Sequence, residues 1–110
     1  MGWARFAMER LQAGETVTIK PHGNSMRGKV ESGDEVLLAP CPQEQLQVGD
    51  IVLVRVAGNI FLHLIKAMDA RRVQIGNNRG KINGWAHKSK VFGVAVEVAG
   101  REVRERPRPL

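Results

Sequence analysis

From residue 16 to residue 99 the chain consists of short runs of β-branched and aliphatic residues, and most runs are bounded by glycine, aspartate, asparagine or proline. Runs of this length between turn-forming residues are typical of strands and leave little room for long helices. We therefore expect strands near residues 16–20, 35–39, 51–57, 60–67, 71–76 and 91–99. Turns are expected between them at 32–34, 48–50, 57–59 and 76–84. Short, closely spaced strands predict a mainly β fold with a compact, twisted or barrel-like sheet.

The residues before these strands follow a different period. Apolar side chains recur there at helical spacing, at Trp3, Phe6, Ala7 and Leu11. No proline interrupts this stretch, and Gly14 follows where a helix would need a C-cap. We expect one short amphipathic N-terminal helix over residues 3–12 that covers the core.

The length of 110 residues suits a single domain, because a second domain would be too small to bury its own core. We expect one β domain over residues 1–100. Residues 101–110 contain four arginines, two glutamates and two prolines without an apolar period. This composition predicts a mobile basic tail.

Several classes of protein are disfavoured by the composition. The longest apolar runs, 51–54 and 60–65, are far shorter than the roughly 20 residues that span a bilayer. The first eleven residues include two arginines and a glutamate, unlike the apolar segment of a secretory signal. We therefore expect a soluble, cytoplasmic protein. A single cysteine, Cys41, excludes an internal disulfide framework and a cysteine-cluster zinc site, and we expect no metal and no organic cofactor.

Positive charge is concentrated in one part of the chain. Residues 66–90 contain seven lysines and arginines but one aspartate, and the formal charge of the whole chain is +6. Such a surface can bind nucleic acid, an acidic protein partner or an anionic membrane, and it can equally be an ordinary solvated face. The sequence leaves these alternatives open.

Ser25 is the candidate nucleophile. Gly23 and Asn24 precede it and tolerate positive φ, so they favour a sharp turn that presents the Ser25 hydroxyl. Backbone N–H groups of such a turn can point to a common spot, as in an oxyanion hole. We expect Gly23, Asn24 and Met26 to contribute to that hole or to the substrate groove. The alternative is an ordinary turn serine.

His63 is the candidate general base. It interrupts the apolar run 60–65, which is apolar enough to be buried on both faces of a sheet. A buried histidine needs a polar partner, because an unpaired buried polar group costs about 1–3 kcal/mol. That partner can be a backbone carbonyl or, in the functional interpretation, Ser25. Lys66 is the weaker candidate base, since on a continuous strand it faces away from His63 and its pKa would need to fall by several units.

Five segments follow one another in an order that carries a family resemblance. They are Gly23-Asn24-Ser25-Met26, Gly33-Asp34-Glu35-Val36, Gly49-Asp50-Ile51-Val52-Leu53-Val54, Phe61-Leu62-His63-Leu64-Ile65 and Gly76-Asn77-Asn78-Arg79. This set resembles the LexA-like and type I signal peptidase superfamily, whose motifs run G-x-S-M, G-D-x-V, G-D-I-V, a strand with lysine or histidine, and G-D-N. The resemblance covers about residues 16–98. Asn77 stands where that family often has aspartate.

The resemblance implies a compact, twisted β fold and a serine peptidase activity. It maps the nucleophile onto Ser25 and the base onto His63, as in the members that use a Ser–His pair. The expected function is a serine endopeptidase that acts on a peptide or protein substrate. The rival is a non-catalytic module for homodimerisation, or for binding an acidic partner or nucleic acid through residues 66–90.

Overall fold

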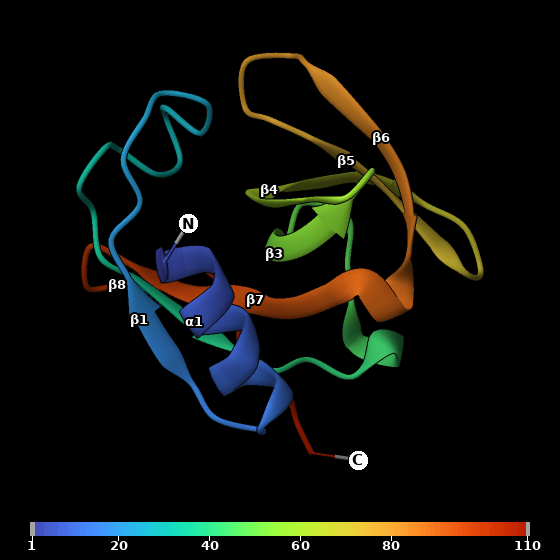
Figure 1. The fold of residues 1–110 in the computed structure, drawn as a ribbon, viewed down its shortest axis with the longest axis horizontal. Coiled ribbons are helices and arrows are strands. Elements are labelled where there is room, and N and C mark those ends of the chain that lie inside the picture. Colours follow the sequence, from blue (N-terminus) through green and yellow to red (C-terminus); the bar gives the residue numbers. More distant parts are fainter. Residues whose placement is uncertain (1, 110) are drawn as a thin grey trace.

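The computed structural model describes residues 2–109 (Figure 1). One helix precedes eight short strands, with two single-turn 3-10 helices between them. In chain order the elements are α1 (Gly2–Gln12), β1 (Val17–Ile19), β2 (Val36–Ala39), η1 (Gln43–Gln45), β3 (Ile51–Val56), β4 (Asn59–Met68), β5 (Arg72–Gly76), β6 (Ile82–His87), η2 (Lys88–Lys90), β7 (Val91–Val98) and β8 (Arg101–Glu102). The mainly β fold with one N-terminal helix, expected from the sequence, is confirmed.

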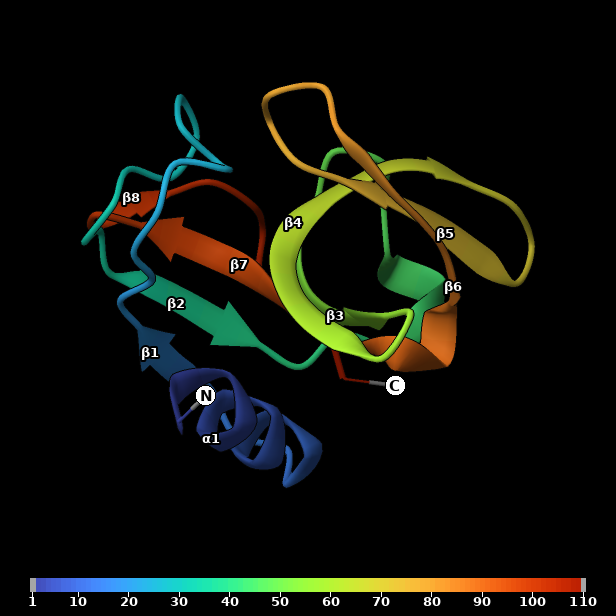
Figure 2. The same cartoon turned by 45° about the horizontal axis from the view of Figure 1, so that its top comes forward.

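The eight strands form one antiparallel sheet with the order β1-β2-β7-β3-β4-β5-β6, and β8 pairs with β7. Figure 2 shows how strongly the ten-residue strand β4 curls, so that β3 to β6 curve round on one side of the molecule. Strands β1, β2 and β7 form the flatter part beside α1. Register shifts interrupt four of the seven strand pairings, and such irregularities help short strands to twist and bend.

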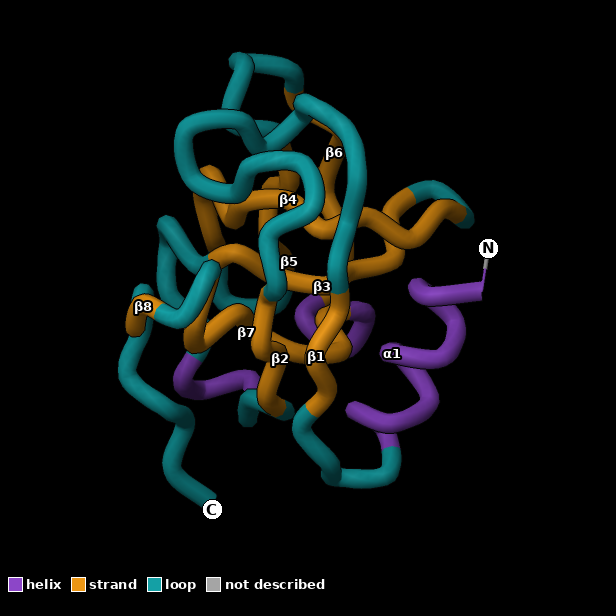
Figure 3. Tube along the Cα trace, turned by 90° about the vertical axis from the view of Figure 1, so that its left-hand side faces the viewer, coloured by secondary structure: helices purple, strands orange, loops and turns teal. Residues whose placement is uncertain are grey.

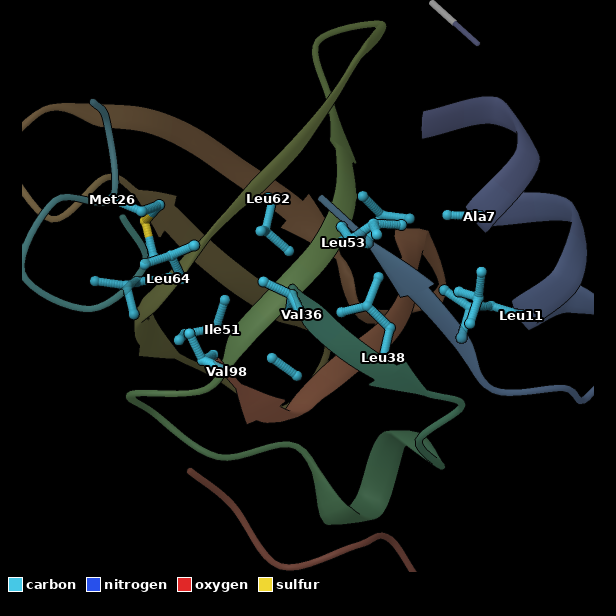
Figure 4. Close-up of a cluster of buried hydrophobic side chains, with 14 residues drawn as sticks. Ala7, Leu11, Met26, Val36, Leu38, Ile51, Leu53, Leu62, Leu64 and Val98 are labelled. Carbon is cyan, nitrogen blue, oxygen red and sulfur yellow. The ribbon is translucent and has the colours of Figure 1, made fainter. Parts of the chain in front are cut away.

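The two faces of the sheet bury separate apolar clusters. Ile51 and Leu53 of β3 point into the cluster beneath α1, which Figure 4 shows, while Val52 and Val54 point into the cluster enclosed by the curled strands. Successive side chains of a strand face opposite sides, so β3 reads as one continuous apolar run. The sheet is therefore covered on both faces at its centre, and this provides a rigid base for the loops at its edge.

Helix α1 ends in a Schellman motif. Glu15 N–H donates to Arg10 O and Gly14 N–H donates to Leu11 O, both at 3.0 Å, with Gly14 at φ +84°. The helix approaches the sheet closely at Gly93, where a Cβ would lie 2.9 Å from Leu11 Cδ2. Figure 3 shows α1 on one flank of the sheet and the C-terminal segment on the opposite flank.

Strand β6 is the main secondary-structure element that the sequence did not predict. Its first residues were expected in the turn 76–84, yet Ile82 to His87 pair with β5. Only Ala86 of this strand is buried, while Ile82 and Trp85 are exposed. The strand therefore lacks the alternation of apolar and polar residues by which half-buried strands are recognised.

The expected boundary at residue 100 is also displaced. Arg101 and Glu102 form β8, and Val103 N–H donates to Val96 O at 2.9 Å. Arg104 then forms an ion pair with the buried Asp50, with Nε 2.9 Å from Oδ1. Residues 101 and 102 thus extend the sheet, and residues 103 and 104 are bonded to the domain, so these four residues are not a separate tail. Within residues 2–109, no helix has the length and apolar character needed to cross a membrane.

Candidate active site

The loop between β1 and β2 carries Ser25 and is fixed by hydrogen bonds across its base. Gly33 N–H donates to Pro21 O at 2.9 Å, and Gly23 N–H donates to Ser32 Oγ at 3.1 Å. Gly23 has φ +127°, the left-handed region that glycine allows, whereas Asn24 does not have a positive φ. The turn expected before Ser25 is therefore made by the glycine.

The Ser25 loop is also joined to the loop between β5 and β6, which lies at the same end of the molecule (Figure 1). Asn78 N–H donates to Ser25 O at 2.9 Å, and Asn78 Nδ2 donates to Arg27 O at 2.8 Å. From beneath, the buried side chains of Met26 and Val30 anchor the loop in the core. Ser25 is thus exposed on a backbone that is held from two sides.

His63 lies in the first half of β4 and contacts two polar side chains. Its Nε2 lies 3.3 Å from Ser25 Oγ, and its Nδ1 lies 2.8 Å from Asn83 Oδ1 on β6. The Phe61 ring stacks on the imidazole with centroids 4.8 Å apart. The fold therefore brings together the two residues that the sequence proposed, and it adds a third, Asn83.

The contact with Asn83 determines which nitrogen of His63 carries the proton. The amide Oδ1 only accepts hydrogen bonds, so Nδ1 must be the protonated nitrogen that donates to it. In the neutral ring Nε2 then has a free lone pair, which can accept the Ser25 hydroxyl proton. This tautomer is the one that a general base requires.

Burial of the imidazole lowers the pKa of His63 below its ordinary value, because desolvation disfavours the charged ring. The hydrogen bond to Asn83 opposes this shift, and the positive charge of Lys81 adds to it. His63 is 6% exposed, and burial of this degree favours the neutral form of the imidazole.

Two backbone N–H groups at Ser25 have no hydrogen-bond partner in the described part of the chain. Within residues 2–109 the N–H groups of Ser25 and Met26 make no hydrogen bond, although their neighbours Gly23 and Arg27 do. Free N–H groups at a nucleophile can stabilise the negative oxygen of a tetrahedral intermediate. Gly23 lines the cavity but its N–H is occupied by Ser32 Oγ, so it is not such a donor.

An open cavity of about 170 Å³ lies in front of Ser25 and His63; we call it the Ser25 cavity. Its polar lining comes from His22, Ser25, Glu31 and His63. Its apolar lining comes from Met26, Val30, the strand residues 60–62 and Trp3 of α1. Asn24 is exposed and outside this lining, unlike the expectation that it contributes to the groove.

The same stretch of β4 has an unpaired edge. Strand β3 pairs with β4 over residues 59–64, but β5 pairs with it only from Leu64 onward. Residues 59–63 therefore have a partner strand on one side only, among the residues described. An unpaired edge beside a cavity can accept an extended peptide as an added strand.

Lys66, the weaker candidate base, lies elsewhere. It lies within the register shift between Ile65 and Ala67, and its Cε lies 3.2 Å from the position of a Cβ on Gly76. No hydrogen bond joins Lys66 to Ser25 or His63 in the described part of the chain. Among residues 2–109, no three His, Cys, Asp or Glu side chains gather where they could hold a metal ion.

Asn83 and Asn78 are the site residues that sequence reasoning missed. Asn83 was placed in a turn, and Asn78 was noted only within the segment that resembles G-D-N. An isolated polar residue inside an Ile-Asn-Gly-Trp strand is a weak signal, and its partner His63 is 20 positions away. Only the pairing of β4, β5 and β6 places the two side chains together.

Comparison with known proteins adds no assignment: no family model, no curated protein and no solved structure matches the chain. The resemblance to the LexA-like and type I signal peptidase superfamily therefore stays a prediction from the sequence motifs.

Proposed function

We propose that this protein is a serine endopeptidase that uses Ser25 as nucleophile and His63 as general base. The observation that carries the proposal is the contact of His63 Nε2 with Ser25 Oγ in a ring whose other nitrogen is held by Asn83. Nucleophile, base and orienting group are the three parts that activated serines require. A cytoplasmic location, expected from the sequence, belongs to the same proposal.

In the first half of the reaction, Ser25 Oγ attacks a peptide carbonyl carbon while His63 Nε2 takes the hydroxyl proton. The N–H groups of Ser25 and Met26 donate to the oxygen that becomes negative. His63 then returns the proton to the amide nitrogen, the C–N bond breaks, and the amine product leaves. A water molecule, deprotonated by the same nitrogen, hydrolyses the ester on Ser25 and restores the serine.

Asn83 is a positioning residue in this mechanism. Its neutral amide holds the tautomer and the orientation of the imidazole but carries no negative charge to stabilise an imidazolium ion. The pKa of His63 is lowered by burial, so the base is a weak one. We therefore expect a slow enzyme whose rate depends more on geometry than on charge.

The substrate is a peptide segment in extended conformation. The free edge of β4 at residues 59–63 offers backbone groups beside the Ser25 cavity. A strand added there would lie past Ser25 with its carbonyls near the free N–H groups. The cavity volume of about 170 Å³ has room for a side chain but not for a folded domain, which favours unfolded or loop segments of proteins.

Labelling with a fluorophosphonate tests the proposal, because an activated serine attacks its phosphorus atom and displaces fluoride, which leaves a stable phosphonate ester on the serine. We expect the wild type to be labelled at Ser25, as shown by mass spectrometry of the modified peptide, and Ser25→Ala to remain unlabelled. Ser89→Ala is the matched control, because Ser89 also contacts a histidine ring, at 2.9 Å. Labelling of Ser89 in place of Ser25, or an inert wild type, contradicts the assignment.

A second candidate function rests on the hairpin of β5 and β6. The Arg72 guanidinium lies 4.8 Å from the centroid of the exposed Trp85 ring, amid the basic residues 66–90. Exposed aromatic rings next to arginine are typical of surfaces that bind single-stranded nucleic acid. Binding of a fluorescent oligonucleotide that weakens steeply with salt and is lost in Trp85→Ala would support this function.

A further inference from the structure

Arg55 lines a second cavity next to the Ser25 cavity. This second cavity, of about 560 Å³, lies between α1 and the tip of the β3–β4 hairpin, and we call it the Arg55 cavity. The two cavities share Ile60 and Phe61 of β4 as lining residues. They therefore follow one another along the unpaired edge of the strand.

The guanidinium group of Arg55 has no acidic partner among the residues that the structure describes. Its guanidinium lies 5.6 Å from the Phe92 ring centroid, and Nη2 lies 3.5 Å from Met8 Sδ. No carboxylate forms an ion pair with it among residues 2–109, and no Asp or Glu lines the Arg55 cavity. A half-buried arginine on aromatic and thioether surface has lost part of its hydration, so it gains from an anionic ligand.

Arg5 of α1 lines the same cavity and adds a second positive charge. Part of this charge is offset by Glu9, whose Oε2 lies 3.6 Å from Arg5 Nε. The lining of the Ser25 cavity contains the opposite charge, because Glu31 is one of its residues. A peptide that crosses both cavities thus meets a carboxylate near the reacting bond and guanidinium groups farther along.

We propose that the Arg55 cavity is a specificity subsite that binds an acidic side chain of the peptide substrate. This inference rests on the proposed peptidase function and adds the class of substrate: extended segments with an aspartate or glutamate at a fixed distance from the cleaved bond. Ile60, which pairs with Arg55 across the hairpin, is three residues from His63 on β4. A strand advances about 3.3 Å per residue, so Ile60 and His63 are about 10 Å apart along β4. We therefore expect the acidic residue of the substrate three or four positions from the cleaved peptide bond.

Peptide binding to the Ser25→Ala variant tests the subsite without any need for catalysis. The probes are fluorescein-labelled decapeptides of alanine, serine and leucine with one aspartate moved through the sequence, and a matched set with asparagine. By fluorescence anisotropy we expect aspartate peptides to bind about tenfold more tightly than their asparagine counterparts. Equal binding of the two sets, or no measurable binding of either, overturns the subsite.

Substitutions of arginine separate the subsite from general attraction to a basic chain. Arg55→Gln in the Ser25→Ala background should remove the aspartate preference, and Arg55→Lys, which keeps the charge and tests folding, should retain part of it. Arg71→Gln removes one exposed charge in the turn before β5 and should leave the preference unchanged. Equal loss in Arg55→Gln and Arg71→Gln, or a dimer that Arg55→Gln dissociates, overturns the proposal.

The position at which the wild type cleaves a peptide is an independent test of the subsite. When the aspartate is moved by one residue, the cleaved bond found by mass spectrometry should move by one residue in the same direction. Cleavage that ignores the aspartate overturns the subsite and leaves the peptidase function standing. A wild type that binds aspartate peptides through Arg55 but is never labelled at Ser25 contradicts the peptidase function instead.

Discussion

Two serine–histidine pairs are in hydrogen-bond contact among residues 2–109, and the pair with the shorter contact is not the one proposed as catalytic. Ser89 Oγ lies 2.9 Å from His87 Nδ1, whereas Ser25 Oγ lies 3.3 Å from His63 Nε2. His87 and Ser89 are exposed at the end of β6, and His63 is buried in β4. The choice of Ser25 as the proposed nucleophile therefore does not rest on the serine–histidine distance alone.

The two histidines differ in what their nitrogens do. His87 Nδ1 also accepts the backbone N–H of Ser89 at 3.0 Å, so the ring caps the short helix η2. His63 accepts at Nε2 and donates from Nδ1 to Asn83 on a different strand. The first arrangement needs only two residues of local chain, while the second needs β4, β6 and the Ser25 loop in place. Because distant elements converge on His63 and not on His87, we propose the pair of Ser25 and His63 as the catalytic one.

The largest expected difference between the two pairs is the effect of removing each histidine. His63→Ala should lower the rate of fluorophosphonate labelling at Ser25 by about 10³-fold or more, because nucleophile and base act as a unit. His87→Ala should leave the rate unchanged. Labelling kinetics followed by mass spectrometry, with circular dichroism to verify folding, measure both. A similar fall of the labelling rate in His63→Ala and His87→Ala would contradict the proposal that only His63 acts as the base.

Lys66→Ala completes this comparison. Lys66 has no hydrogen bond to Ser25 in the described chain, and we expect its removal to change the labelling rate less than about threefold, within the range of a remote surface change. An inactive Lys66→Ala together with an active His63→Ala would transfer the role of base to the lysine.

A smaller effect is expected from substitution of Asn83, which orients the ring of His63. The exposed pair of His87 and Ser89 has no corresponding amide contact among residues 2–109. Asn83→Ala should slow labelling about 10- to 100-fold, because the imidazole loses the partner that fixes its tautomer. Asn83→Asp should raise the pKa of His63, since a carboxylate then faces the ring and favours its charged form. The pH dependence of labelling separates the two variants, because the rate follows the neutral form of His63.

In the wild type the rate should rise with pH and level off, with its midpoint below about 6.5, the ordinary value for histidine. Asn83→Asp should move that midpoint upward, and Asn83→Ala should lower the plateau. A midpoint that does not move in Asn83→Asp would show that Asn83 does not face the His63 ring in solution.

A residue of this site can be predicted from the sequence only where its neighbours in the chain give a signal, and not where strand pairing alone brings it to the site. Ser25 and His63 were identified from a serine after Gly-Asn and a histidine in an apolar run, together with the ordered motifs that resemble the LexA-like and type I signal peptidase superfamily. Asn83 lies in a strand that is largely exposed, so its neighbours show no period. A register shift between Ile75 and Gly76 sets its place opposite β5, and a shift of this kind cannot be counted from the sequence.

The ion pair between Arg104 and Asp50 could not be predicted from the sequence either. Arg104 is one of four arginines in the last ten residues, and nothing in the composition separates it from the others. Its partner Asp50 belongs to the motif Gly49-Asp50-Ile51-Val52, which predicted only a turn and a strand. The fold buries Asp50 beside Gln45, whose carbonyl also accepts from Arg104, and this makes one arginine different from the rest.

The Ser25 loop is held by two hydrogen bonds from Asn78, to Arg27 O and to Ser25 O. Asn78→Ala removes the bond from Nδ2 to Arg27 O but keeps the backbone bond to Ser25 O. We expect labelling to slow by less than about tenfold, because the serine is positioned less well but the base is intact. Arg79→Ala, an exposed neighbour, is the control. A loss as large as that of His63→Ala would mean that the loop collapses without this tether.

The smallest expected effect is on stability, and its sign follows from the pKa of His63. Because this pKa is lowered in the folded state, the unfolded chain binds the proton more readily, and stability rises with pH between the folded pKa and about 6.5. The contribution is fully present above that window and is lost as the pH falls through it. Urea unfolding at pH 8 and at pH 5 should therefore show a larger loss of unfolding free energy in the wild type than in His63→Gln. His87→Gln should keep the wild-type loss, since His87 lies exposed at the surface; an equal loss in wild type and His63→Gln would mean that the buried ring does not resist protonation.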